Sequence, residues 1–195
     1  MIFLIRHGQT RFNREGRLQG RLDSELTELG IEQARRMGRI LRDFVEDPGA
    51  WSMISSPLRR AQHTAEIVRE ETGLSCLIEL DHRITEVSGG EWEGLTRDEI
   101  LARRPDVDGG LSGRDMLMAL GGEDDASLDR RLSAWLADLD EADGRRRIVV
   151  SHRSAGHRLR QLYAGVGRDV EPPPQDAVFL LHRGVVGRVD EGWEG

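Results

Sequence analysis

The chain has 195 residues, of which 28 are basic and 35 acidic, so its formal charge is −7. This length fits one domain with a sizeable core, and the acidic balance argues against nucleic acid and anionic membranes as partners. No apolar run approaches the ~20 residues that cross a bilayer. The apolar start, residues 1–5, lacks a basic region before it, so we expect no signal peptide and a cytoplasmic protein.

All the basic residues are arginine, because the sequence contains no lysine. Enzymes that form a Schiff base or use pyridoxal phosphate need a lysine amine, and a nucleotide-binding P-loop needs the lysine of its motif. The single cysteine, Cys76, excludes a disulfide within the chain and metal sites built from several cysteines. The composition therefore excludes pyridoxal-phosphate and Schiff-base enzymes, P-loop nucleotide-binding proteins and cysteine-based metal proteins as classes for this chain.

Strand and helix patterns alternate along the chain, because short apolar runs predict buried strands and apolar steps of three and four predict amphipathic helices. In chain order we expect a strand at 2–5, a helix capped by Thr27, a strand at 51–55, a helix from Ser56-Pro57 to about Glu71 and a strand at 75–80. A later helix around 128–139, a strand at 148–150, a helix at 155–164 and a hairpin at 177–189 that turns at Arg183-Gly184 complete the series.

This alternation predicts an α/β fold of three layers, α/β/α, with a mostly parallel sheet and helices on both faces. We expect one domain, residues 1–195, that contains a small cap and acid-loop insertion at 84–125. Within the insertion, a capping box at Thr96–Glu99 predicts a helix that ends near Pro105, and residues 106–122 are expected to be rich in loops. Sheets of this kind bind ligands at the carboxyl ends of their strands.

Four polar motifs lie directly after predicted strands or at helix starts. They are Arg6-His7-Gly8-Gln9-Thr10 with Asn13 close behind, then Arg59-Arg60-Ala61, then Glu86 followed by Gly90-Glu91-Trp92-Glu93-Gly94, and finally Ser151-His152. Each motif alone has a structural interpretation, since a histidine after a strand most often serves as a hydrogen-bonding group. Two histidines and two arginines in one crevice of an acidic protein, however, would form a positive pocket that suits a phosphate dianion.

The four motifs in this order resemble the histidine phosphatase superfamily, which includes phosphoglycerate mutases, acid phosphatases and α-ribazole phosphatase. The resemblance extends over nearly the whole chain and implies a phosphoglycerate mutase-like fold. The segment from Arg6 to Thr10 is similar to the family signature, and His152 matches its second histidine. One position departs from the pattern, because Arg153 stands where the family usually has glycine.

The resemblance implies that His7 attacks the phosphoryl group and forms a phosphohistidine, and neutral imidazole is a competent nucleophile at neutral pH. Arg6, Arg60 and His152 would stabilise the charge on the phosphoryl oxygens, and Glu86 would act as general acid and then as general base. The arginines would stand in place of a metal ion, so no metal and no cofactor are expected. The candidate substrate contacts are Gly8, Gln9, Thr10, Asn13, Gln19, Gly20 and Arg153.

The sequence thus favours a metal-independent phosphatase that acts on phosphomonoesters of small metabolites. One alternative is a 2,3-bisphosphoglycerate-dependent phosphoglycerate mutase, and another is a non-catalytic phosphate-binding or interaction module. Mutases of this superfamily carry an insertion after the acid-loop glutamate, with a tyrosine-glycine element and a lysine. Here the loop 87–94 is short, Tyr163 is the single tyrosine, and the chain is expected to lack a closing tail. The sequence leaves a homodimer open.

Overall fold

The computed structural model describes residues 1–107, 113–139, 144–165 and 172–189. Its central element is a six-stranded sheet in the order β3-β2-β4-β1-β5-β6. Strand β1 pairs in parallel with β4, β4 with β2 and β2 with β3, whereas β5 runs antiparallel to both β1 and β6. The strands are β1 (Ile2–Arg6), β2 (Trp51–Ser55), β3 (Ile78–Leu80), β4 (Arg146–Ser151), β5 (Val178–His182) and β6 (Val185–Arg188).

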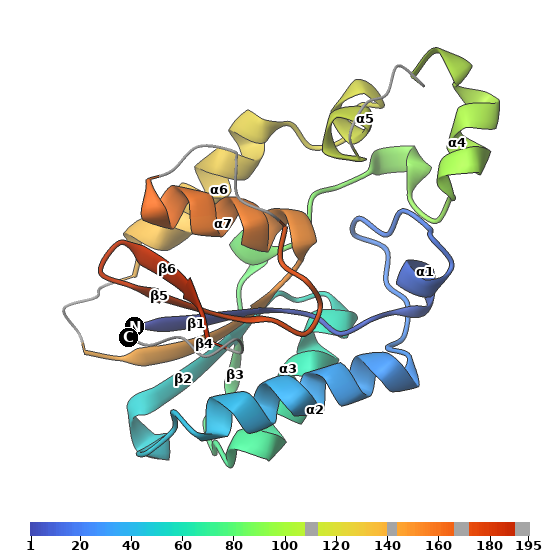
Figure 1. Cartoon of the computed structure of the whole chain (residues 1–195). Helices are drawn as coiled ribbons and strands as arrows, with labels where there is room; N and C mark the ends of the chain where they lie inside the picture. Colours follow the sequence, from blue (N-terminus) through green and yellow to red (C-terminus); the bar gives the residue numbers. More distant parts are fainter. Residues whose placement is uncertain (108–112, 140–143, 166–171, 190–195) are drawn as a thin grey trace.

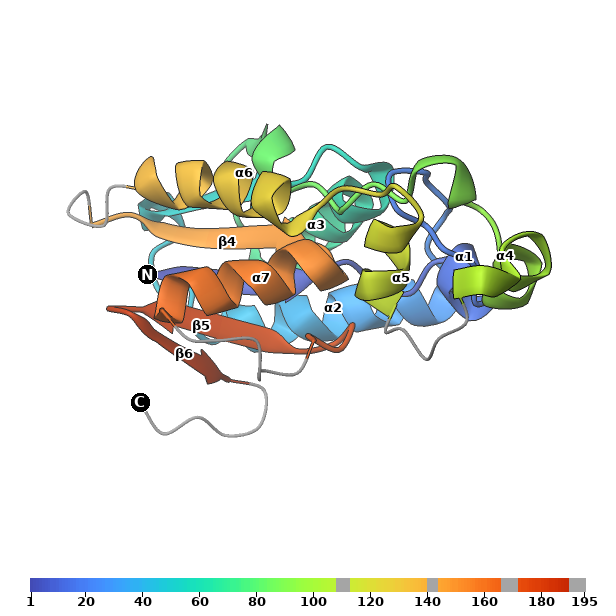
Figure 2. The ribbon, with the colours of Figure 1, turned by 90° about the horizontal axis from the view of Figure 1, so that it is seen from above.

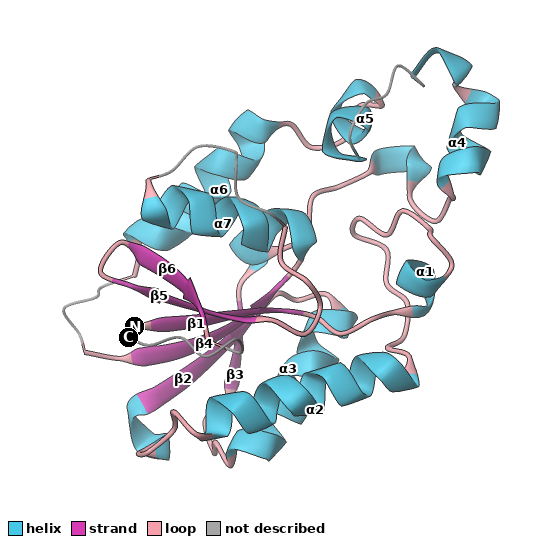
Figure 3. Ribbon diagram, in the orientation of Figure 1, coloured by secondary structure: helices cyan, strands magenta, loops and turns pink. Residues whose placement is uncertain are grey.

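Helices cover both faces of this sheet, as Figures 1 and 3 show. Helices α2 (Glu28–Arg42) and α3 (Arg59–Thr72) lie on one face, and α6 (Asp125–Ala137) and α7 (Arg153–Ala164) lie on the other. Three short helices, α1 (Arg11–Arg14), α4 (Arg97–Arg103) and α5 (Gly113–Ala119), extend beyond the carboxyl end of β1, which Figure 2 shows from above. The predicted three-layer α/β/α architecture with a mostly parallel sheet is therefore confirmed.

The middle of the sheet is buried on both faces, which explains why its strands are continuous apolar runs. Alternate residues of a strand point to opposite faces, so Ile2 and Leu4 of β1 pack under α6 and α7, in the core that contains Leu132 and Trp135. Phe3 and Ile5 pack in the second core, with residues of α2 and α3. The two cores hold the ends of β1 and β4 in fixed positions.

Local signals placed most element boundaries correctly. Thr27 caps α2, and its hydroxyl oxygen accepts the N–H of Gly30 at 3.1 Å. The hairpin turns where expected, with positive φ at Arg183 and Gly184, as a type I′ turn requires. The predicted start of α3 is wrong, because the helix begins after Leu58, and the Ser56 hydroxyl pairs with His152 Nε2 at 2.7 Å instead.

The segment expected to be rich in loops contains a helix, α5, and a small third core. Met116 and Leu120, one helical turn apart, pack with Trp92, Ile100 and Val107. The Trp92 indole N–H also donates to Leu120 O at 3.1 Å. The glycines that flank this apolar pattern hid its helical period. Throughout the described part of the chain, no helix is long and apolar enough to cross a membrane.

Candidate active site

A cavity of about 570 Å³ opens at the carboxyl ends of the parallel strands. All four sequence motifs meet here, because β1 ends at Arg6, α3 starts near Arg60, and β4 ends directly before His152. Arg6, His7, Arg60 and Glu86 line the cavity, together with Asn13, Gln19, Gly20 and Arg153. His152 lies behind His7 with its ring centroid 5.2 Å away, and it is fully buried.

The hydrogen bonds of His7 determine which ring nitrogen is available for reaction. Its Nδ1 lies 2.8 Å from Gly8 O, and a carbonyl oxygen only accepts, so Nδ1 carries the proton. The lone pair is consequently on Nε2, where it accepts the Nε–H of Arg60 at 3.3 Å. Nε2 is therefore the ring nitrogen whose lone pair is available for reaction.

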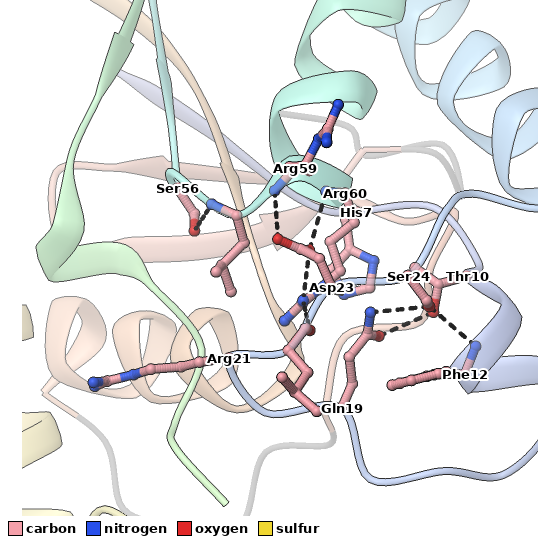
Figure 4. A network of polar contacts seen from close by, with 12 residues as sticks. His7, Thr10, Phe12, Gln19, Arg21, Asp23, Ser24, Ser56, Arg59 and Arg60 are labelled. Carbon is pink, nitrogen blue, oxygen red and sulfur yellow. Dashed lines mark hydrogen bonds and ion pairs between the residues drawn. The ribbon is translucent and has the colours of Figure 1, made fainter. Parts of the chain in front are cut away.

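Arg60 is held by the loop that follows α1, and Figure 4 shows part of this network. Its guanidinium donates to Gly20 O at 2.6 Å, to Leu22 O at 2.7 Å and to Asp23 Oδ1 at 3.0 Å. The Asp23 carboxylate also accepts the backbone N–H of Arg59 at 2.9 Å. Sequence reasoning missed Asp23. The available signal was a carboxylate in the first loop that could balance an arginine buried in the core.

Two buried nitrogens beside His7 have no hydrogen-bond partner within the described ranges. They are Nε of Arg6 and Nδ1 of His152. Other nitrogens of the same two side chains do have partners. Nη1 of Arg6 donates to Pro173 O at 3.2 Å, and Nε2 of His152 pairs with the Ser56 hydroxyl. Buried polar nitrogens without a partner are costly and rare. The Nε–H of Arg6 is a donor, and Nδ1 of His152 is one when Nε2 accepts the Ser56 hydroxyl, so their position beside His7 indicates a site for an oxyanion.

Burial is the main cause that holds the pKa values of His7 and His152 well below 6.5, and the charges of Arg60 and Arg6 add to it. Burial likewise lowers the pKa of Arg6 to about 10, and the charge of Glu86 works in the opposite direction. Both histidines are therefore neutral near pH 7, while the arginines remain cations. A neutral nucleophile surrounded by cations suits attack on a phosphate dianion.

The depressed histidine pKa values predict that the protein loses stability in mild acid. Below about pH 6.5 the unfolded chain binds protons that the folded chain does not, so the free energy of unfolding rises with pH across this window. Each buried histidine contributes up to about 1.4 kcal/mol per pH unit. Urea unfolding between about pH 5 and pH 7 should show a shallower slope for His152→Asn than for the exposed control His63→Asn. Equal slopes would contradict neutral burial of His152.

Glu86 is the first residue of the acid loop, residues 86–94, and it connects this loop to the start of α7. Its Oε1 accepts the N–H groups of Val87 at 3.0 Å and Ala155 at 3.1 Å, and its Oε2 accepts the N–H of Ser154 at 3.1 Å. Helix α7 has no capping side chain of its own at His152, so Glu86 fills that place from a distant segment. The carboxylate is thus oriented at the wall of the cavity by main-chain donors.

Three of the candidate substrate contacts make internal contacts instead of lining the cavity. Gly8 packs so closely on Gly30 that a Cβ would overlap its carbonyl oxygen. The Gln9 N–H donates to Gln33 Oε1 at 2.8 Å, and the Thr10 hydroxyl caps α1 and donates to Gln19 Oε1 at 2.9 Å. These residues position the loop around His7, whereas Asn13, Gln19, Gly20 and Arg153 line the cavity.

Glu93 is a second residue whose role sequence reasoning missed, although its motif was noted. Its carboxylate accepts the N–H groups of Arg21 at 3.0 Å, Leu22 at 3.0 Å and Gly89 at 2.7 Å. It therefore fastens the loop whose carbonyls bind Arg60 to the acid loop that contains Glu86. The signal available in the sequence was a carboxylate flanked by glycines that let two loops approach closely.

This junction leads to a prediction for Gly20, which has a φ of +53° and lies so close to Glu93 that a Cβ would overlap the carboxylate. Gly20→Ala should displace the Gly20 carbonyl from Arg60 and reduce turnover at least tenfold. Gly16→Ala is the matched control, since Gly16 has a φ of +67° with no atom within 4 Å of a Cβ. Both changes carry the backbone cost of about 1 kcal/mol, but overlap adds about 1–3 kcal/mol at Gly20 only. Similar losses of activity and stability in both variants would contradict this prediction.

The fold and the site together define an α/β protein with a neutral histidine in an arginine-lined pocket, an arrangement typical of enzymes that handle phosphoryl groups. The model of the histidine phosphatase superfamily (branch 1) matches residues 2–171, and the chain belongs to this superfamily. A relative from Salmonella paratyphi A, a probable phosphoglycerate mutase GpmB, is 39% identical over 157 residues, which is 77% of this chain and 68% of the relative.

Solved structures of phosphatases share the fold. A mycobacterial glucosyl-3-phosphoglycerate phosphatase, in complex with VO3, aligns with a TM-score of 0.72 at 26% identity and covers 91% of this chain and 88% of its own. A putative alpha-ribazole-5'-P phosphatase from Escherichia coli K-12 aligns with a TM-score of 0.77 at 22% identity, covering 96% and 93%, and shows likeness of fold. The chain is accordingly a hydrolase of the phosphatase class.

Proposed function

We propose that the protein is a metal-independent phosphatase that hydrolyses phosphomonoesters of small metabolites through a phosphohistidine on His7. The observation that carries the proposal is the orientation of the His7 ring. Its Nδ1 is bound to Gly8 O, which leaves the Nε2 lone pair beside Arg60 and next to buried donors of Arg6 and His152. This arrangement presents a neutral nucleophile to a bound phosphate dianion.

In the first step a P–N bond forms at His7 Nε2 and the P–O bond to the leaving group breaks. Arg6, Arg60 and His152 donate to the phosphoryl oxygens, whose charge needs fixed donors in the transition state. The leaving oxygen takes a proton from Glu86. Oε2 is the favoured oxygen for this proton, because it accepts one N–H while Oε1 accepts two.

In the second step a water attacks the phosphohistidine, the P–N bond breaks and inorganic phosphate leaves. Glu86 takes the proton of that water and returns to the form in which it began the cycle. General acid–base assistance of this kind contributes roughly 10²–10⁴-fold to the rate. The arginines supply the positive charge that a metal ion supplies in other phosphatases.

Residues 84–125 are proposed to form a cap that selects the substrate. Glu86, Val87 and Leu117 from this segment line the cavity, and its outer part has its own small core around Trp92. The side chains that surround the leaving group would then come from the cap and from α7. We propose small phosphorylated metabolites as substrates, because a cavity of about 570 Å³ accommodates molecules of that size.

A phosphoglycerate mutase is the second candidate, and the similarity to a probable phosphoglycerate mutase favours it. A mutase must keep water from its phosphohistidine until the substrate has reoriented, which calls for an enclosing lid. Here the acid loop is short and is fastened by Glu93 to the loop at 20–22. The chain also lacks any lysine with which to grip a substrate. Hydrolysis is therefore favoured over transfer.

Purified protein with a metal chelator should release phosphate from a panel of phosphomonoesters. With 3-phosphoglycerate and the bisphosphate primer, the ratio of isomerised to hydrolysed product should stay well below one. A ratio well above one would establish the mutase instead. Absence of phosphate release from every ester, with inorganic phosphate still bound, would indicate the non-catalytic binding module.

A further inference from the structure

Among the described residues, five arginines line the cavity, and four of them have hydrogen-bond partners within the protein. Arg60 pairs with Asp23 at 3.0 Å, Arg17 with Glu99 at 2.9 Å, and Arg158 with Asp129 at 2.6 Å. Arg6 donates to Pro173 O at 3.2 Å. The guanidinium groups of Arg60, Arg17 and Arg158 are thus each paired with a carboxylate, and Arg6 is held by a main-chain carbonyl with its Nε left for the phosphoryl group.

The fifth arginine, Arg153, is different. It is the first residue of α7, its side chain is exposed, and it lines the cavity. Within the described ranges of the chain, no hydrogen bond or ion pair involves its guanidinium group. The Arg153 guanidinium is thus an exposed cation at the wall of the cavity, and its N–H donors are available to a bound molecule.

The charge of Arg153 acts on the same region as the other cations. After burial and the opposing charge of Glu86, it is the next cause of the low pKa of Arg6. A cation placed beside Arg6 without a compensating carboxylate raises the positive potential of the cavity. An anion bound at this point would remove that repulsion.

We propose that Arg153 binds a second oxyanion of the substrate, so that the protein prefers phosphomonoesters whose leaving group carries a carboxylate or another phosphate. This inference rests on the proposed phosphatase function. The transferred phosphoryl group has its own donors around His7, and Arg153 faces the remainder of the substrate from α7. A guanidinium fork matches a carboxylate and a phosphate equally well.

The surrounding residues are compatible with this subsite. Ser154 and His157, also on α7, line the same cavity. The lining also includes the carboxylates of Asp115 in α5 and Asp125 in α6, and each of them has an interaction partner of its own. We place the second oxyanion at Arg153, the first residue of α7.

The test compares 3-carboxyphenyl phosphate with 3-carbamoylphenyl phosphate, which are similar in size and differ in charge. For the wild type, kcat/KM should be at least about tenfold higher for the carboxylate, the effect of one charge-assisted contact of about 1.4 kcal/mol. Arg153→Gln should remove most of this preference, so that the ratio of the two kcat/KM values falls about tenfold. Arg42→Gln, at an exposed arginine at the end of α2, should keep the wild-type ratio.

A third ester, with a phosphonate at the same ring position, identifies the source of the oxyanion. For each anionic ester, kcat/KM is divided by the kcat/KM of the carbamoyl ester. The subsite accepts the anion that gives the larger ratio in the wild type and loses it in Arg153→Gln. A ratio that is the same in wild type and Arg153→Gln overturns the proposal. This holds even where both rates fall together, since Arg153 would then act on the transferred phosphoryl group or on Glu86.

Binding of non-hydrolysable analogues separates this inference from the proposed function. The affinities of 3-carboxybenzylphosphonate and 3-carbamoylbenzylphosphonate, measured by calorimetry, should differ about tenfold in the wild type and much less in Arg153→Gln. If no ester is hydrolysed but this difference is present, the phosphatase function fails and the subsite stands. If esters are hydrolysed and the difference is absent in both measurements, the subsite fails and the phosphatase stands.

Discussion

His7→Ala is expected to abolish phosphate release and phosphohistidine formation while the protein remains folded. The loss in kcat should be about 10⁴-fold or more, the scale on which removal of a nucleophile acts. The reason is geometric, since the His7 Nε2 lone pair is the one aligned by the Gly8 carbonyl and flanked by Arg60. Rapid quenching with a phosphorylated substrate, followed by detection of acid-labile protein-bound phosphate, measures the intermediate directly.

The control for this variant is His63→Ala, an exposed histidine on α3 that does not line the cavity. It should retain both turnover and the acid-labile phosphate. Circular dichroism and urea unfolding should show that His7→Ala is folded, because His7 belongs to neither of the two hydrophobic cores. Acid-labile phosphate on the alanine variant would refute His7 as the nucleophile.

Glu86→Gln is expected to lower the rate on alkyl phosphates by about 10²–10⁴-fold and the rate on 4-nitrophenyl phosphate by much less. An alkoxide is a poor leaving group that needs a proton, whereas nitrophenolate leaves without one. The glutamine amide has one acceptor oxygen, so it also loses part of the contact with the N–H groups of Ser154 and Ala155. The measurement is the dependence of kcat/KM on the leaving-group pKa for wild type and variant.

Glu91→Gln, an exposed carboxylate in the same loop, is the matched control and should leave this dependence unchanged. Loss of the Glu86 contacts to α7 should also reduce the free energy of unfolding by about 1–2 kcal/mol. This loss of stability does not depend on the leaving group, so it is separate from the loss of proton donation. Equal rate losses for alkyl and nitrophenyl esters would show that Glu86 positions α7 and does not donate the proton.

Much of the fold could be predicted because its signals are local. The apolar run of β1, the capping hydroxyl of Thr27 and the turn at Arg183-Gly184 depend on interactions within a few residues. Such interactions leave a period or a dipeptide in the sequence. The errors arose where a local signal competed with a tertiary contact, as at Ser56, whose hydroxyl pairs with His152, 96 residues away in the chain.

The contacts within the site could not be predicted, because they join segments far apart in sequence. Arg60 is anchored by carbonyls about 40 residues earlier, at Gly20 and Leu22. Glu86 accepts the N–H of Ala155 across 69 positions. Gly8 looked like a ligand contact from its place in the signature, but it is the close approach of Gly30 that requires glycine there.

The sequence by itself determined the layer order, the four motifs and their meeting place, because parallel strands bring their carboxyl ends to one edge of a sheet. Tertiary structure alone decided which nitrogen of His7 carries the lone pair, which carbonyls and carboxylate hold Arg60, and that Arg153 faces the cavity without a partner among the described residues. The sequence gives the type of each side chain, but the hydrogen-bond partner of that side chain depends on where other segments pack. Chemistry that rests on protonation state and on uncompensated charge is therefore decided by packing.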